Sequence, residues 1–215
     1  MEKKLIIENI VKKIKSIIIN ERKSDQLSMQ LSRLTVNQFK KNEDFTLESI
    51  QFERGDEYAN FDFICTFIAD ENFNFPFSVR GGGDMQTLEI EITYRPDDFP
   101  KHMTDLVAEI KETIEHELEH IEQQNFDDMY VDDEDIDEDD NFEYLTSSEE
   151  VPAYVRGLIK RSKTKRISLL DAMEEWFSEN KLKFKNPKKE WPLVKKIWTD
   201  YANEMRSKER IKKFK

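Results

Sequence analysis

Cysteine, glycine and long apolar runs are scarce in this chain, and each shortage excludes a class of protein. A single Cys among 215 residues cannot form an internal disulfide or an all-thiolate zinc site. The five glycines include no phosphate-binding loop, because no Lys-Ser/Thr pair follows Gly81-Gly82-Gly83. No apolar run approaches the roughly 18 residues of a membrane-spanning helix. We therefore expect a soluble, cytoplasmic protein without a membrane partner, and we place Cys65 in its core.

The N-terminal segment is basic and apolar, which raises the question of a targeting signal. Charges at Glu8, Lys12, Lys13 and Lys15 interrupt its apolar run, and no small-residue cleavage site follows. The pattern predicts an amphipathic helix over residues 2–20 instead of a signal peptide.

Charge of the two signs is divided unequally along the chain. Residues 1–150 contain 15 Lys/Arg and 38 Asp/Glu, whereas residues 151–215 contain 19 Lys/Arg and 8 Asp/Glu. Such a division predicts either two surfaces with different partners or two halves that attract each other. Nucleic acid is not an expected partner, because the acidic part would repel phosphate and no nucleic-acid motif is present.

The periodicity of apolar residues predicts a sheet followed by helices. A central strand is predicted around Cys65, because every second residue is apolar and some of the intervening residues are apolar too. The alternating residues are Phe61, Phe63, Cys65 and Phe67. Within residues 86–94 apolar residues alternate with polar ones, which predicts a half-solvated strand. The three adjacent glycines before this strand predict a flexible turn. The expected fold is α+β, with a mixed or antiparallel sheet of about four strands over residues 45–95 packed on a long helix.

We divide the chain into a domain over residues 1–163 and a basic helical extension over residues 164–215. Within the domain, the sheet is followed by three further segments. These are a helix over 103–124, an acidic loop over 127–143 and a second helix over 148–163.

Two of the three histidines, His116 and His120, lie four residues apart on the strongest helical pattern in the chain. Side chains at this spacing project from one helical face, so two imidazoles can bind a single zinc ion. Glu117 lies at the edge of that face, where its carboxylate can reach a water on the metal without being a ligand. His102 precedes this helix and is expected to be a surface or capping residue.

A catalytic zinc ion takes three protein ligands and leaves one position open. No third histidine is suitably placed, so the third ligand should be a carboxylate from the next helix. Glu150 is favoured over its neighbour Glu149, because the small Ala153 lets the helix carrying them approach the histidine helix closely. The alternative is that both glutamates are ordinary acids of a first helical turn.

The sequence His116-Glu117-Leu118-Glu119-His120, with a later glutamate on a second helix, resembles the zinc metallopeptidases called zincins, and among them the gluzincins. The resemblance covers about residues 86–160. It implies a zincin-like fold, Zn²⁺ as cofactor, and hydrolysis of a peptide or protein substrate. The family's roles fall on His116, His120 and Glu150 as metal ligands and on Glu117 as general base.

The runs HELEHIEQ and YLTSSEEVPAYVRGL are similar to those of small HExxH proteins encoded by tailed phages. This resemblance implies an alternative function, a virion-associated structural or partner-binding protein with a zincin-like fold and little or no turnover.

In zincins the strand before the metal helix borders the cleft, so the resemblance assigns substrate pairing to residues 86–94. Glu89 and Glu91 of that strand, with the acidic charge of this part of the chain, favour basic substrates. The candidates for stabilising the oxyanion are Tyr144, Tyr154 and Arg156, and the acidic loop is a candidate lid.

Overall fold

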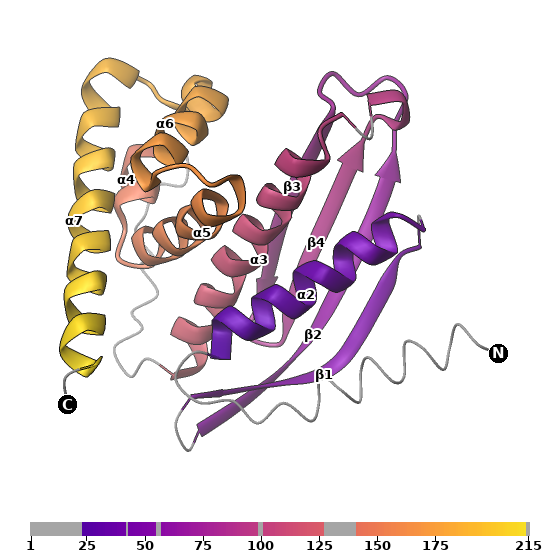
Figure 1. Ribbon diagram of the computed structural model, residues 1–215, viewed down its shortest axis with the longest axis horizontal. Helices are drawn as coiled ribbons and strands as arrows, with labels where there is room; N and C mark the ends of the chain where they lie inside the picture. The colour runs from indigo at the N-terminus through magenta and orange to yellow at the C-terminus, as the bar shows by residue number, and fades with distance from the viewer. Residues whose placement is uncertain (1–22, 42, 55–56, 99–100, 127–140, 214–215) are drawn as a thin grey trace.

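The computed structural model describes residues 23–41, 43–54, 57–98, 101–126 and 141–213 (Figure 1). The fold is α+β, with a four-stranded mixed sheet and a group of helices. The predicted helix over residues 2–20, and residues 127–140 of the predicted acidic loop, lie outside the described residues.

The sheet has the strand order β1-β2-β4-β3, so the last strand in sequence is inserted beside the second. β2 pairs with β1 in antiparallel and with β4 in parallel orientation, and β3 pairs with β4 in antiparallel orientation. The predicted central position of the strand around Cys65 is confirmed. The strands are β1 (Phe45–Arg54), β2 (Glu57–Ala69), β3 (Phe77–Asp84) and β4 (Thr87–Tyr94).

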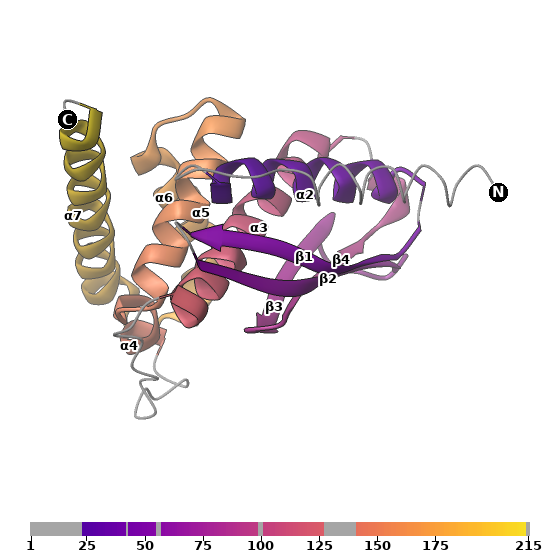
Figure 2. The same ribbon diagram turned by 90° about the horizontal axis from the view of Figure 1, so that it is seen from below.

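The main core lies on one face of the sheet, beneath α2 (Lys23–Phe39) and α3 (Met103–Phe126) (Figures 1 and 2). Alternate strand residues point toward these helices, and Cys65 is fully buried among them, as predicted. Glu89 and Glu91 alternate with buried residues of β4 and therefore point to the opposite face of the sheet.

The predicted flexible turn at the three adjacent glycines is wrong, because these residues belong to β3 and the turn falls at Met85 and Gln86. A Cβ on Gly81 would collide with the Glu117 side chain of α3, so glycine lets the strand pass this close. Gly83 has a φ of +149° and a Cβ there would meet the Thr87 carbonyl oxygen. Close approach, and not flexibility, explains glycine at these two positions.

The pairing of residues 86–94 with a substrate strand is also excluded by the sheet order. β4 is bonded to β2 on one side and to β3 on the other, so neither of its edges is available. The strand next to α3 at the edge of the sheet is β3, and Pro76 just before it is typical of an edge position, because proline cannot donate a backbone hydrogen bond.

The remaining helices form a second layer beside α3, with a core of their own (Figure 1). Its residues come from both the predicted second helix and the predicted extension, and they include Trp176, Trp191 and Trp198. The domain boundary at residue 163 stays a prediction. No described helix has the length and apolar character to cross a membrane. The helices are α4 (Asn141–Thr146), α5 (Glu150–Lys165), α6 (Leu169–Asn180) and α7 (Pro187–Lys213), with short 3₁₀ turns at Pro96–Asp98 and Lys181–Lys183.

Several boundaries of the predicted segments shift. α4 includes the last three residues of the predicted acidic loop, and α5 begins at Glu150 instead of residue 148. Ser168 followed by Asp171 three residues later is a sequence pattern that predicts a helix start, and it is confirmed, because the two residues form a capping box for α6.

Candidate metal centre

Helix α3 has two sides of opposite character, and this polarity places the histidines. Leu106, Ile110, Ile114 and Leu118 are fully buried against the sheet and α2. His116 lies two residues after Ile114, about 200° around the helix, and therefore faces away from the sheet. The helix that packs on this second side is α5.

Ion pairs join α3 to α5, and we call three of them the ion-pair ladder. As the residue number rises on α3 it falls on α5, so the two helices run antiparallel. The ladder sets which residues of the two helices lie opposite one another, and it accounts for part of the attraction predicted between the acidic and basic parts of the chain. Its pairs are Glu112 with Arg161 (3.0 Å), Glu115 with Lys160 (3.1 Å) and Glu119 with Arg156 (2.6 Å).

Small residues on α5 let the two helices approach closely. A Cβ on Gly157 would lie 2.9 Å from the Glu112 carbonyl oxygen. Ala153, one turn earlier, is completely buried, in agreement with the role predicted for it. The close approach brings the first turn of α5 next to the two histidines.

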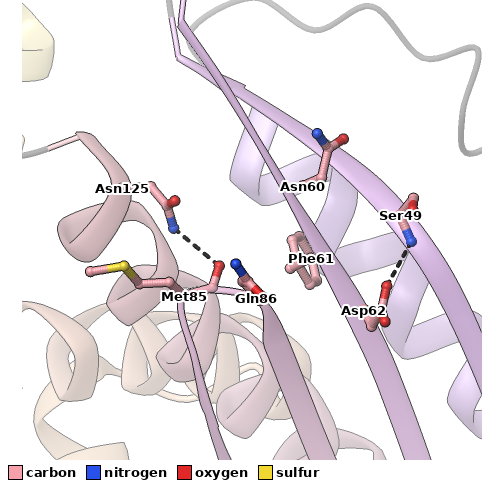
Figure 3. A pocket seen from close by; sticks show the side chains of 7 residues that line it. All are labelled: Ser49, Asn60, Phe61, Asp62, Met85, Gln86 and Asn125. Carbon is pink, nitrogen blue, oxygen red and sulfur yellow. Dashed lines mark hydrogen bonds between the residues drawn. The ribbon is translucent and has the colours of Figure 1, made fainter.

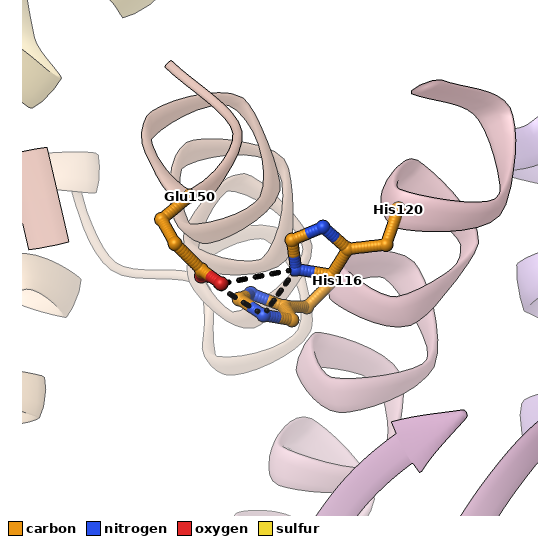
Figure 4. A group of neighbouring side chains, drawn as sticks. All are labelled: His116, His120 and Glu150. Carbon is orange, nitrogen blue, oxygen red and sulfur yellow. Dashed lines mark hydrogen bonds and ion pairs between the residues drawn. The ribbon is translucent and has the colours of Figure 1, made fainter. Parts of the chain in front are cut away.

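His116, His120 and Glu150 converge at this point, as the sequence predicts (Figure 4). One ligand atom from each residue lies within 4.8 Å of the others. The two Nε2 atoms are 3.1 Å apart, and each lies 3.4 Å from a different oxygen of the Glu150 carboxylate. Glu149 is outside this group, and its backbone carbonyl instead accepts a hydrogen bond from Gln123.

The three residues fit a divalent metal ion by their chemistry and by an unsatisfied atom. Two imidazoles and one carboxylate are a donor set that zinc takes in catalytic sites. Glu150 Oε2 is buried without a hydrogen-bond partner in the described part of the chain, a costly state that a cation would relieve. The imidazole side chains keep 14% and 18% of their surface exposed, so the group is accessible to solvent.

Electrostatics divide the two histidines. Burial lowers the pKa of His116 to about 4, and the neighbouring His120 acts in the same direction. Burial also disfavours a charge on His120, but the Glu150 carboxylate outweighs it and raises the His120 pKa. The pKa of Glu150 is lowered, because the two imidazoles outweigh its burial. His116 is therefore neutral at pH 7, with a ring nitrogen available to a metal.

Glu117 lies on a third side of α3, facing the edge strand. Its side chain packs against Gly81 of β3, and burial raises its pKa to about 7. His120 and Glu150 are near enough to influence that pKa, in opposite directions. The predicted general base is thus adjacent to the group of predicted ligands, between them and β3.

Two of the three candidate oxyanion stabilisers are at the site. The Tyr154 ring packs edge-on against His116 with centroids 4.6 Å apart, and the Tyr144 side chain is near enough to Glu150 to interact with its carboxylate. Arg156 is instead held by Glu119 and Glu122 in the ion pairs between α3 and α5. The structure therefore favours the tyrosines over Arg156 for any role at this centre.

A separate open pocket of about 480 Å³ lies elsewhere, between the β1–β2 pair and the end of α3 (Figure 3). Asp62 Oδ1 accepts the backbone N–H of Ser49, and Asn125 donates to the Met85 carbonyl at its rim. Its lining contains neither histidine nor a pair of acids, so we do not place chemistry there. The lining residues are Ser49, Asn60, Phe61, Asp62, Met85, Gln86 and Asn125.

The sequence predicted the three converging residues but missed two that shape their surroundings. Gln123 follows His120 by three residues, a spacing that places it on the same side of α3. Gly81 allows β3 to approach Glu117. The sequence feature that could have indicated this close approach is the run of three glycines, which was interpreted as a turn.

Comparisons of the chain with models of known families, with curated proteins and with solved structures find no match. The residues and geometry of this centre are therefore the basis for inferring a function.

Proposed function

We propose that this protein is a zinc-dependent metallopeptidase with a zincin-like fold. The observation that carries the proposal is the convergence of His116, His120 and Glu150 from two helices, with Glu117 beside them. Their order along the chain, and the α+β fold around them, agree with the resemblance to gluzincins.

His116, His120 and Glu150 would hold the ion, leaving a position for water. A zinc ion bound by these residues supplies Lewis acidity, which activates water and polarises a carbonyl at neutral pH. Glu117 accepts the proton of the attacking water and returns it to the leaving nitrogen, as a general base and then a general acid. The hydroxyl of Tyr144 is the first candidate donor to the negative charge that develops on the carbonyl oxygen.

The edge strand β3 is the proposed docking site for the substrate backbone. It follows α3 from Glu109 to Glu117, since the Val79 N–H donates to Glu109 and Gly81 contacts Glu117. An extended peptide added to this edge would place a carbonyl near Glu117. Glu89 and Glu91 point to the other sheet face, so the preference for basic substrates stays a prediction from charge alone.

Three single variants test the proposal on the zinc-loaded protein, with a peptide mixture as substrate and cleavage sites mapped by mass spectrometry. Glu117→Gln should keep one zinc ion per chain and lose cleavage, because the amide cannot accept the proton. His120→Ala should lose zinc, whereas the control His102→Ala should keep both zinc and cleavage. Undiminished cleavage by Glu117→Gln would contradict the mechanism.

A second candidate function is a structural or partner-binding protein with little or no turnover, virion-associated if phage-encoded. This function is favoured by where the three residues lie. Helix α3, which carries the histidines, packs in the core beneath the sheet, whereas α5, which carries Glu150, packs in the separate core of the C-terminal helices. A metal bound between them would join the two cores. Loss of folding on chelation, in a protein that cleaves no peptide, would favour this function.

A further inference from the structure

Gln123 is a buried polar residue between the predicted ligands of the two helices. The residue has only 6% of its surface exposed, and its side chain reaches the start of α5. Its Nε2 donates a hydrogen bond of 3.1 Å to the backbone carbonyl of Glu149, the residue before Glu150. The bond therefore joins the turn after His120 to the start of the helix that carries the third predicted ligand.

This bond also fixes which way the Gln123 amide points. A backbone carbonyl can only accept, so the NH₂ group must face Glu149 and the oxygen must face the other way. Oε1 is buried and forms no hydrogen bond within the described part of the chain. A buried amide oxygen in this state is expected to have a donor close by.

His120 is the candidate for that donor. Its Nε2 faces Glu150 and His116, which leaves Nδ1 as the ring nitrogen free for another contact. The Gln123 side chain is near enough to interact with the imidazole. A metal-binding histidine usually donates its other ring N–H to a neighbouring acceptor, which fixes the tautomer and the ring orientation.

We propose that Gln123 is a positioning residue of the metal centre. Its Oε1 accepts the Nδ1–H of His120 and thereby holds the Nε2 lone pair toward the ion. Its NH₂ group ties the same turn of α3 to the residue before Glu150. Glutamine suits this position because one terminal amide supplies both an acceptor and a donor.

The inference rests on the proposed metal site, and it is tested by metal affinity instead of peptide cleavage. We would load the full chain with Co²⁺, record its visible absorption, and measure Zn²⁺ affinity by competition with a chromophoric chelator. Gln123→Met has a side chain of similar length without the amide oxygen or the NH₂ group, whereas Gln123→Glu keeps an oxygen acceptor and loses the NH₂ donor. Gln51→Met, on the exposed side of β1, controls for the substitution itself.

Gln123→Met should weaken Zn²⁺ binding by roughly 10–100-fold and alter the Co²⁺ spectrum. Gln123→Glu should stay within a few-fold of the parent, because a carboxylate accepts from His120 at least as well. Unfolding of the metal-free variants, followed by circular dichroism, separates loss of affinity from loss of folding.

Parent-like affinity and spectrum in Gln123→Met would overturn the positioning role. Equal weakening in Gln123→Met and Gln123→Glu would overturn it too, since the bond to Glu149 would then account for the whole effect. A parent chain that binds neither ion overturns the proposed function and this inference with it. If the parent binds both ions and the Gln123 variants show the same affinity and spectrum as the parent, only the positioning role of Gln123 is overturned.

Discussion

The two sides of α3 hold the protein together in different ways. The side facing the sheet is a strip of Leu and Ile side chains, and Ile110, Ile114 and Leu118 have no exposed surface. The side facing α5 contains the ion-pair ladder and the two histidines. Apolar burial is strong but not directional, whereas ion pairs add little net stability and define which groups meet.

This difference explains why the candidate centre lies on the charged side. A shift of α5 by one helical turn would separate Glu150 from His116 and His120. The same shift would leave the buried Glu112 carboxylate without its partner Arg161. The ladder therefore selects the register of the two helices, while the apolar strip supplies most of the stability.

The largest expected effect comes from removing one partner of the most buried pair. Arg161→Ala leaves the buried Glu112 carboxylate without its guanidinium and should lower the free energy of unfolding by about 3–5 kcal/mol. The double variant Glu112→Leu/Arg161→Met should recover most of that loss. Urea denaturation measures both.

The exposed pair Lys196–Asp200 on α7 provides the control. Lys196→Ala should cost less than about 0.5 kcal/mol, because solvent screens this pair. A double variant at 112 and 161 as unstable as Arg161→Ala would contradict the separate roles of the two sides.

Ile114→Ala makes the matching change on the apolar side. It should lower the free energy of unfolding by about 2–5 kcal/mol through lost burial and a cavity. Zinc affinity of the folded variant should stay within a few-fold of the parent, as measured by chelator competition, because α5 is untouched. A large loss of affinity would mean that the two sides are not separable.

Glu109 predicts a pH dependence on the side that faces β3. Burial raises its pKa to about 7, with Glu112 and Glu179 acting in the same direction and Arg161 and the Val79 N–H opposing. The folded state then holds a proton that the unfolded state loses near pH 4.5. Its contribution to stability is present below pH 4.5 and is lost as the pH rises to about 7.

Glu109→Gln should therefore be more stable than the parent at pH 8, by roughly 1–3 kcal/mol, and similar to it at pH 4.5. The amide oxygen can still accept from Val79. Thermal unfolding of both proteins across this range measures the difference, and a difference independent of pH would contradict the assignment.

Gly81→Ala and Gly82→Ala sharpen the comparison at the edge strand. A Cβ on Gly81 collides with Glu117 and Thr113, whereas a Cβ on Gly82 meets nothing within 4 Å. Gly81→Ala should lower the free energy of unfolding by roughly 1–2 kcal/mol and displace Glu117, which would slow the proposed peptide cleavage without loss of zinc. Gly82→Ala should change neither quantity appreciably, and equal effects of the two variants would contradict the close approach.

Local patterns in the sequence were enough to predict the parts that depend on one helix. The spacing of His116 and His120 and the capping box at Ser168 each lie within a single turn or two, so helical periodicity determines them. Glu150 could be preferred over Glu149 because the small Ala153 implied which face of α5 approaches α3.

The parts that the sequence did not predict depend on non-local pairing. The insertion of β4 between β2 and β3 is a parallel contact between strands that are not consecutive, and no local pattern specifies it. The glycines of β3 have a turn-like composition, and only the position of Glu117 across the helix explains Gly81. Gln123 acquires its contact from Glu149, which is distant in the sequence.

A crystal structure of the zinc-loaded chain, with diffraction recorded on both sides of the zinc absorption edge, tests the central claim most directly. We expect one anomalous peak per chain, between the Nε2 atoms of His116 and His120 and the carboxylate of Glu150. A zinc-loaded crystal whose only anomalous peaks lie elsewhere, or whose His116 and His120 point away from Glu150, would contradict the account.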